Sequence, residues 1–198
     1  MIKPFAQLIL AHGAGAGKSS SFMQDMARLL EEKGIAVQLF DFDYMKVATE
    51  TGKKRPPEKI DKLQQQFHAQ IALRDISLPL FIGGKSMGGR VASMIFAGLD
   101  AKGCVCLGYP FHPPGKTDKL RIEHLQTLTK PLLVVQGERD TFGNQTEIPD
   151  YQLPDSVAVE FLGDGDHSFK PRKASGLSLD ENMQLAADKV AAFIQSHC

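Results

Sequence analysis

The sequence predicts an α/β protein with a doubly wound, mainly parallel sheet of about six strands flanked by helices. Short apolar runs alternate along the chain with amphipathic stretches, and this alternation is typical of parallel strands joined by helices. No repeat, low-complexity tract or interdomain linker interrupts it, so residues 1–198 are expected to form a single domain. The expected strands are residues 8–11, 37–42, 80–82, 104–107, 132–136 and 157–162.

Helical periodicity separates these strands. An apolar face that includes Phe22 and Met26 predicts a helix that ends at Gly34, and the spacing around Leu63 predicts another. The last helix is expected to open with a capping box at residues 178–181. Its inward face is predicted to consist of Met183, Ala187, Val190 and Ile194.

Three longer polar connections, residues 45–57, 110–119 and 164–176, join the predicted elements. Open parallel sheets place their binding sites outside the carboxyl ends of the strands. We therefore expect these connections to form the rim of a site at that edge.

Charge and composition exclude several classes of function. The 23 basic and 23 acidic residues balance, and the dense basic cluster at residues 53–55 adjoins two prolines in a predicted surface loop, so we expect no nucleic-acid partner. Cys104 and Cys106 fall on one face of a predicted strand, which favours packing in a reducing compartment over a disulfide framework. Residues 1–10 carry too short an apolar run for a signal peptide, and no stretch approaches the roughly twenty apolar residues of a membrane span. We expect a soluble, cytoplasmic protein.

A Gly-x-Ser-x-Gly pentapeptide, residues 84–88, lies between the third predicted strand and a helix predicted over residues 90–96. This setting is typical of a nucleophile elbow, a strained strand-to-helix turn that exposes a serine hydroxyl at the edge of the sheet. The small flanking residues allow neighbouring backbone segments to pack closely. The pattern makes Ser86 a candidate nucleophile.

An elbow serine needs a histidine base and a carboxylate that orients the base, in the chain order Ser, Asp or Glu, His. Glu138 and Asp140 follow the fifth predicted strand, and His167 follows the sixth. Both groups therefore fall at strand carboxyl ends, beside the elbow. We predict His167 as the base and Asp140 as the orienting acid, with Glu138 as the competing candidate from the same turn.

Acyl transfer also requires backbone N–H donors for an oxyanion. The residue after the serine, Met87, offers one amide. The glycine-rich segment at residues 12–17 follows the first predicted strand and offers the second, with Ala14 preferred and Gly13 or Gly15 left open.

The same segment continues as Gly17-Lys18-Ser19 and resembles part of a phosphate-binding loop. The spacing G-x-x-x-x-G-K-[ST] requires glycine where this chain has His12, so the match fails by one residue. We expect a polar helix start here instead, with Ser21 and Gln24 forming a capping box. A P-loop-like nucleotide binder is the least favoured hypothesis.

These motifs together resemble the α/β-hydrolase superfamily, from the first strand to the last helix. Residues 10–16, 83–90, 108–116 and 164–167 narrow the resemblance to a small, lidless branch near the dienelactone hydrolases, which also includes hydrolase-like regulatory subunits of animal chromatin complexes. The resemblance implies a minimal fold without a cap domain. It also implies a nucleophile at Ser86, an acid at Asp140, a base at His167 and oxyanion amides at Ala14 and Met87.

The expected function is that of a serine hydrolase acting on a small or exposed ester, thioester or related acyl bond, with no metal or organic cofactor. We expect a small-molecule acyl substrate as its partner, neither nucleic acid nor membrane, and leave the oligomeric state open. The alternative is a non-catalytic hydrolase-fold module that binds a protein. Lys85 either offers positive charge to an anionic substrate or packs against a neighbouring strand. Substrate contacts are expected from His12, Gly13, Lys85, Tyr109, Phe111 and His112.

Overall fold

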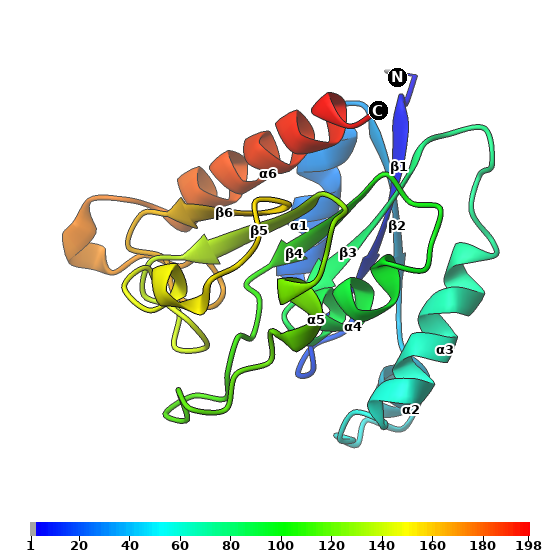
Figure 1. Ribbon diagram of the computed structural model, residues 1–198. Coiled ribbons are helices and arrows are strands. Elements are labelled where there is room, and N and C mark those ends of the chain that lie inside the picture. The colour runs from blue at the N-terminus through cyan, green and yellow to red at the C-terminus, as the bar shows by residue number, and fades with distance from the viewer. Residues whose placement is uncertain (1–2) are drawn as a thin grey trace.

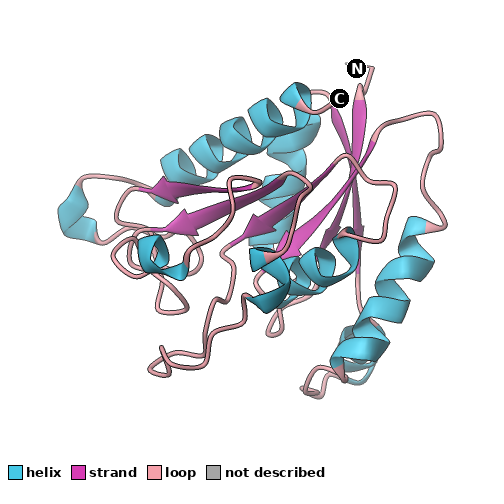
Figure 2. Cartoon of the chain, viewed as in Figure 1, coloured by secondary structure: helices cyan, strands magenta, loops and turns pink. Residues whose placement is uncertain are grey.

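The computed structural model describes residues 3–198 and shows a six-stranded sheet with helices on both faces (Figure 1). The strand order is β2-β1-β3-β4-β5-β6, and all neighbouring strands are parallel. The strands in Figure 2 fan out with the twist of the sheet, and because every neighbouring pair is parallel, their carboxyl ends lie at one edge. The predicted fold class is confirmed. The strands are β1 (Ala6–Ala11), β2 (Ile35–Phe40), β3 (Leu80–Lys85), β4 (Gly103–Leu107), β5 (Leu132–Gly137) and β6 (Val157–Leu162).

The helices form two layers, each with its own hydrophobic core. Helices α1 (Ser21–Glu31) and α6 (Leu179–Ser196) cover one face of the sheet, and α3 (Ile60–Ile71), α4 (Met87–Phe96) and the short α5 (Glu123–Gln126) cover the other (Figure 1). Strands β1, β3, β4 and β5 are buried along their whole length, as expected for parallel strands covered on both faces. The remaining helices are α2 (Asp43–Thr51), η1 (Ile148–Tyr151) and η2 (Lys173–Ser175).

Two local predictions near the start of the chain are wrong. The second strand ends at Phe40, and a helix, α2, occupies much of the connection expected over residues 45–57, because Phe42 and Tyr44 turn into the core below it. The capping box expected between Ser21 and Gln24 is absent from the described structure. Gln24 Nε2 instead donates to the Lys18 carbonyl (2.8 Å). The capping box at the start of α6 is confirmed.

The strand order changes direction between β1 and β3, since the chain passes from β1 outward to β2 and then returns to β3. The loops that leave β1 and β3 therefore diverge and open a crevice between them, which is where sheets of this type bind ligands. No cap domain is inserted within residues 3–198. Among the helices described there, none is long and apolar enough to cross a membrane.

Candidate active site

Ser86 connects β3 to α4 in a strained backbone conformation. Its φ of 51° and ψ of −116° lie outside the regions that L-residues ordinarily adopt. Two backbone hydrogen bonds hold the turn: the Ser86 amide donates to the Leu107 carbonyl on β4, and the Arg90 amide donates to the Ser86 carbonyl, both at 3.0 Å. This is the geometry of a nucleophile elbow.

Glycines on either side of Ser86 make this turn sterically feasible. A Cβ atom at Gly84 would lie 2.3 Å from the carbonyl carbon of Gly88, and one at Gly88 would lie 2.5 Å from the Ala11 carbonyl oxygen on β1. Both distances are far below van der Waals contact. The Gly-x-Ser-x-Gly pattern is therefore a packing requirement of the crossing between β3, α4 and β1.

A continuous chain of hydrogen bonds joins Ser86, His167 and Asp140. His167 Nε2 lies 2.8 Å from Ser86 Oγ, and His167 Nδ1 lies 2.8 Å from Asp140 Oδ2. The ring of Phe142 packs against the imidazole, with 4.2 Å between the ring centroids. Because Asp140 can only accept when ionised, the arrangement places a hydrogen on Nδ1 and leaves Nε2 as the acceptor for the serine hydroxyl.

The Asp140 carboxylate is fully buried and is held by further donors. The Phe142 amide donates to Oδ1 (2.8 Å), and Gln136 Nε2 donates to Oδ2 (2.9 Å). Gln136, the penultimate residue of β5, also bonds both backbone groups of Tyr109 and so ties the end of β5 to the end of β4. No motif in the sequence marks this glutamine or Phe142.

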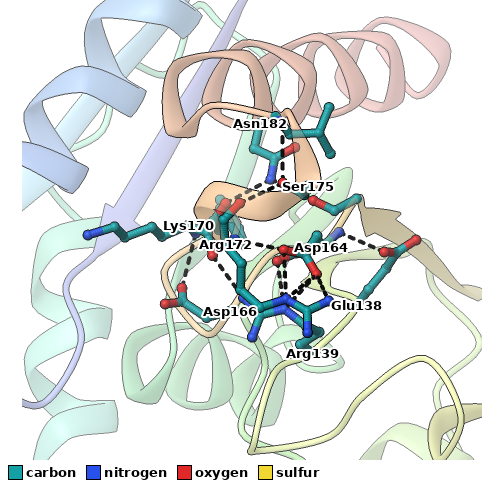
Figure 3. A network of polar contacts seen from close by, with 11 residues as sticks. Glu138, Arg139, Asp164, Asp166, Lys170, Arg172, Ser175 and Asn182 are labelled. Carbon is teal, nitrogen blue, oxygen red and sulfur yellow. Dashed lines mark hydrogen bonds and ion pairs between the residues drawn. The ribbon is translucent and has the colours of Figure 1, made fainter.

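Glu138 leaves the same turn as Asp140 but points elsewhere. Its Oε2 accepts from the Asp164 amide at 2.6 Å, and this contact holds the loop that carries His167 (Figure 3). Asp164 itself adopts a positive φ of 50° and pairs with the Arg172 guanidinium, which holds the pKa of that carboxyl below its usual range. The structure thus brings Asp140, not Glu138, to the imidazole.

The rest of the polar network in Figure 3 fixes the same loop. Asn182 on α6 donates to the carbonyls of Gly163 (3.0 Å) and Phe169 (2.8 Å), and Arg139 Nε donates to the Asp164 carbonyl (2.9 Å). The loop after β6 is therefore anchored to α6 and to the turn after β5. Such anchoring gives His167 a defined position although it lies outside regular structure.

His12 and Tyr44 hold the loop that follows β1. The Phe42 amide donates to His12 Nε2 (3.1 Å), so the hydrogen of this neutral ring lies on Nδ1, which donates to the Gly13 carbonyl (2.6 Å). Burial lowers the pKa of His12, which favours this neutral form. The Tyr44 hydroxyl donates to the carbonyls of Gly13 (3.4 Å) and Ala14 (3.1 Å).

These bonds also orient the neighbouring amide. In a trans peptide the N–H points opposite to the C=O, so a Gly13 carbonyl held by His12 and Tyr44 turns the Ala14 N–H the other way. Gly13 lies directly against the nucleophile turn, where a Cβ on it would be 3.6 Å from Ser86 Cβ. Met87 is the first residue of α4, and its N–H belongs to the first-turn donors that have no acceptor within the helix.

Two cavities meet over Ser86. The α1-side cavity, about 350 Å³, is lined by residues 13–16 and 20–23 together with Lys85, Ser86, Phe142, His167 and Ser168. The α4-side cavity, about 240 Å³, is lined by Ala14, Pro57, Ser86, Met87, Arg90, Pro110, Arg121 and Phe142. Ala14, Ser86 and Phe142 belong to both, so the serine lies at their junction.

Lys85 forms part of the α1-side wall, and its ammonium group is buried. Nζ donates to the His167 carbonyl (2.6 Å) and lies 5.3 Å and 5.9 Å from the ring centroids of Phe22 and Phe169. Burial lowers the pKa of Lys85 to about 8. The side chain therefore contacts the backbone of the loop that carries His167, an arrangement that neither interpretation of the sequence included.

The structure places four of the residues expected to contact substrate away from both cavities. His12, Tyr109, Phe111 and His112 are at most 1% exposed and line neither cavity. Aromatic packing draws Tyr109 and Phe111 into the core beside α4, the Tyr109 hydroxyl donates to the Arg121 carbonyl (2.8 Å), and His112 Nε2 lies 3.1 Å from Glu147 Oε2. Gly13 and Lys85 do lie in the cavity wall.

The contacts of Lys18 and Gly17 argue against a phosphate-binding loop at residues 12–19. The Lys18 amide, which would face a phosphate in such a loop, donates to Asp41 Oδ1 at 2.7 Å. A Cβ on Gly17 would lie 2.7 Å from the same oxygen. A carboxylate thus occupies the position that an anionic ligand would need.

The fold and the elbow define a class, the α/β hydrolases. A family model described as "Alpha/beta hydrolase domain" matches residues 4–195, and the chain belongs to this family. The predicted membership of the superfamily is confirmed.

Solved structures with the same fold support this assignment. An α/β serine hydrolase homologue from Coxiella burnetii superposes with a TM-score of 0.72 at 16% identity, covering 96% of this chain and 86% of that one. A lidless α/β serine hydrolase from Xanthomonas campestris gives 0.67 at 19% identity, covering 96% and 83%. A dienelactone hydrolase from Anabaena variabilis gives 0.66 at 20% identity, covering 94% and 87%. At these identities the likeness establishes the fold.

Proposed function

We propose that the protein is a serine hydrolase that cleaves a small or exposed ester, thioester or related acyl bond of a small-molecule substrate. The observation that carries the proposal is the pair of 2.8 Å contacts that link Ser86 Oγ to His167 Nε2 and His167 Nδ1 to Asp140 Oδ2. Family membership supports hydrolase activity in general, and these contacts supply the chemistry.

In the first half of the reaction, Ser86 Oγ attacks the carbonyl carbon while His167 Nε2 accepts its proton. Asp140 keeps the hydrogen on Nδ1 and stabilises the imidazolium that forms. The amides of Ala14 and Met87 donate to the oxyanion of the tetrahedral intermediate. The intermediate then collapses, the imidazolium protonates the leaving group, and an acyl-enzyme remains on Ser86.

In the second half, water enters where the leaving group was. His167 accepts a proton from the water, hydroxide adds to the acyl carbon, and the same amides stabilise the second oxyanion. Collapse returns the proton to Ser86 Oγ and releases the acid. Since His167 lies in the α1-side wall, this cavity is the one through which leaving group and water reach the base.

The test is covalent labelling with a fluorophosphonate probe, followed by intact-mass analysis. We expect one adduct on the wild-type protein and none on Ser86→Ala, with circular dichroism showing that both are folded. Folded wild-type protein that stays unlabelled would refute the proposal and favour a hydrolase-fold module that binds a protein.

The cysteines Cys104, Cys106 and Cys198 are free thiols, which supports our further proposal that the enzyme works in the cytoplasm.

A further inference from the structure

Two arginines line the α4-side cavity together with the nucleophile, and neither has a counter-ion among the described residues. Arg90 is on the first turns of α4, and Arg121 precedes α5; both line this cavity together with Ser86. Arg90 Nε is buried and has no hydrogen-bond partner. Within residues 3–198, neither guanidinium takes part in an ion pair.

The two guanidinium groups also affect each other. Burial, together with the charge of Arg90, lowers the pKa of Arg121, and the same charge contributes to lowering the pKa of His124. A pair of neighbouring cations with no carboxylate partner raises the free energy of the folded state, because each loses hydration and repels the other. An anion between them would relieve both effects, and the planar fork of arginine suits a carboxylate or phosphate.

The position of His167 decides which part of the substrate carries that anion. A leaving group must accept its proton from His167 Nε2, and His167 lines the α1-side cavity. The acyl group then extends to the other side of Ser86, into the α4-side cavity. Its volume of about 240 Å³ leaves room for a short acyl chain.

From this arrangement we infer that the substrate is an ester or thioester of a short acyl group with a terminal anion, which Arg90 and Arg121 bind together. The inference rests on the proposed function, since it assigns the acyl group by its distance from the base. Arg90 and Arg121 are specificity-determining residues in this scheme, and they leave the chemical steps to Ser86 and His167.

The kinetic test compares esters that differ in the end of the acyl chain. Monoethyl glutarate carries a carboxylate, ethyl 4-phosphonobutyrate carries a phosphonate, and ethyl hexanoate is a neutral ester of similar length. We expect the wild-type kcat/KM for one of the two anionic esters to exceed that for ethyl hexanoate at least tenfold, which also identifies the preferred anion. The absence of any preference for an anionic ester would overturn the inference.

Variants connect that preference to the two arginines. Arg90→Gln and Arg121→Gln are each expected to lower kcat/KM for the preferred anionic ester about tenfold or more, and to change the rate for ethyl hexanoate less than about threefold. Arg121→Lys should restore part of the preference, because it restores the charge without the fork. The control Lys119→Gln removes an exposed positive charge from the same loop and should keep the full preference. Equal losses for charged and neutral esters would mean that the arginines only support the fold.

A binding measurement tests the anion site independently of the hydrolase reaction. Calorimetric titration of Ser86→Ala with glutarate and with 4-phosphonobutyrate needs neither turnover nor an arginine variant. We expect saturable binding of one anion, abolished when Arg121→Gln is added. Binding in a protein whose wild type resists fluorophosphonate would leave the anion site standing while the proposed hydrolase function fails. Protein that is labelled and active but binds neither anion would refute the anion site and leave the proposed hydrolase function standing.

Discussion

Burial of the Lys85 ammonium group lowers stability by an amount that depends on pH. The side chain is 8% exposed, and burial lowers the pKa of Lys85 from 10.5 to about 8. A base with a lower pKa in the native state than in the unfolded state destabilises the fold wherever the unfolded chain holds the extra proton. The cost is fully present below pH 8, at about 3 kcal/mol, and disappears as the pH rises from 8 to 10.5.

The substitution Lys85→Met removes the charge and keeps an unbranched side chain of similar length. It also removes the hydrogen bond to the His167 carbonyl, worth about 1 to 1.5 kcal/mol, and the contacts of Nζ with Phe22 and Phe169, worth about 0.5 to 1 kcal/mol. The variant should therefore be more stable than wild type by about 1 kcal/mol at pH 7, equally stable between pH 9 and pH 10, and less stable by about 1 kcal/mol at pH 10.5, where the native amine is neutral and only the hydrogen bond is lost.

Urea unfolding followed by circular dichroism at pH 7, 8, 9, 10 and 10.5 measures this reversal. Other titrating groups contribute equally to both proteins, so the difference between the two free energies of unfolding isolates Lys85. The exposed control Lys119→Met should differ from wild type by a small amount that does not change with pH. A Lys85→Met variant that is less stable at every pH by a constant amount would refute the reasoning, since the ammonium would then carry no burial cost.

Asp140→Asn should keep the fold and lower kcat/KM on a short activated ester by about ten-thousandfold, because the amide favours the wrong imidazole tautomer. Glu138→Gln should cost far less, since Glu138 contacts the Asp164 amide and not His167; equal losses would contradict the choice of acid. MgATP and MgGTP should not raise Tm, because Asp41 already accepts from the Lys18 amide. Tight binding would add about 2.7 kcal/mol at a hundredfold excess over Kd, so a shift that disappears in Lys18→Ala would reverse this conclusion.

The grouping of Ser86, Asp140 and His167 could be predicted from their positions in the sequence. Each follows a strand, and in a parallel sheet the ends of the strands lie at the same edge. Every strand carboxyl end lies at one edge of the sheet, so the loops that follow β3, β5 and β6 share that edge, and Ser86 and His167 can meet there although they are 81 residues apart. The strands themselves are short apolar runs bounded by glycine or polar residues. Such runs are the elements that the sequence predicts most clearly. Their predicted limits differ most at β3, which continues three residues further to Lys85, and at β2, which is displaced by two residues at each end and is half-buried because it lies at the edge of the sheet.

The residues that support the site could not be predicted in the same way. Gln136 reads as the polar end of a strand, and only the contact with Tyr109, 27 residues away, shows its function. Tyr44 lies in a helix too short and polar to detect from spacing, yet its hydroxyl fixes two carbonyls of the loop after β1. The aromatic segment around Phe111 has the composition of a cleft lining, but packing against Tyr151 makes it core.

The distribution of charge around Ser86 departs from the balance of the whole chain. Formal net charge is zero, yet Lys85, Arg90 and Arg121 surround the nucleophile with no ion pair to any of the described residues. Folding alone would favour an apolar side chain at Lys85, because burial of its ammonium group lowers the pKa to about 8 and so costs about 3 kcal/mol at pH 7. The positive potential of Arg90 and Arg121 stabilises the permanent charge of an acyl group that ends in an anion. These two arginines should therefore select the substrate, while Lys85, on the other side of Ser86, shows by its pH-dependent burial cost that the fold keeps a cation beside the nucleophile.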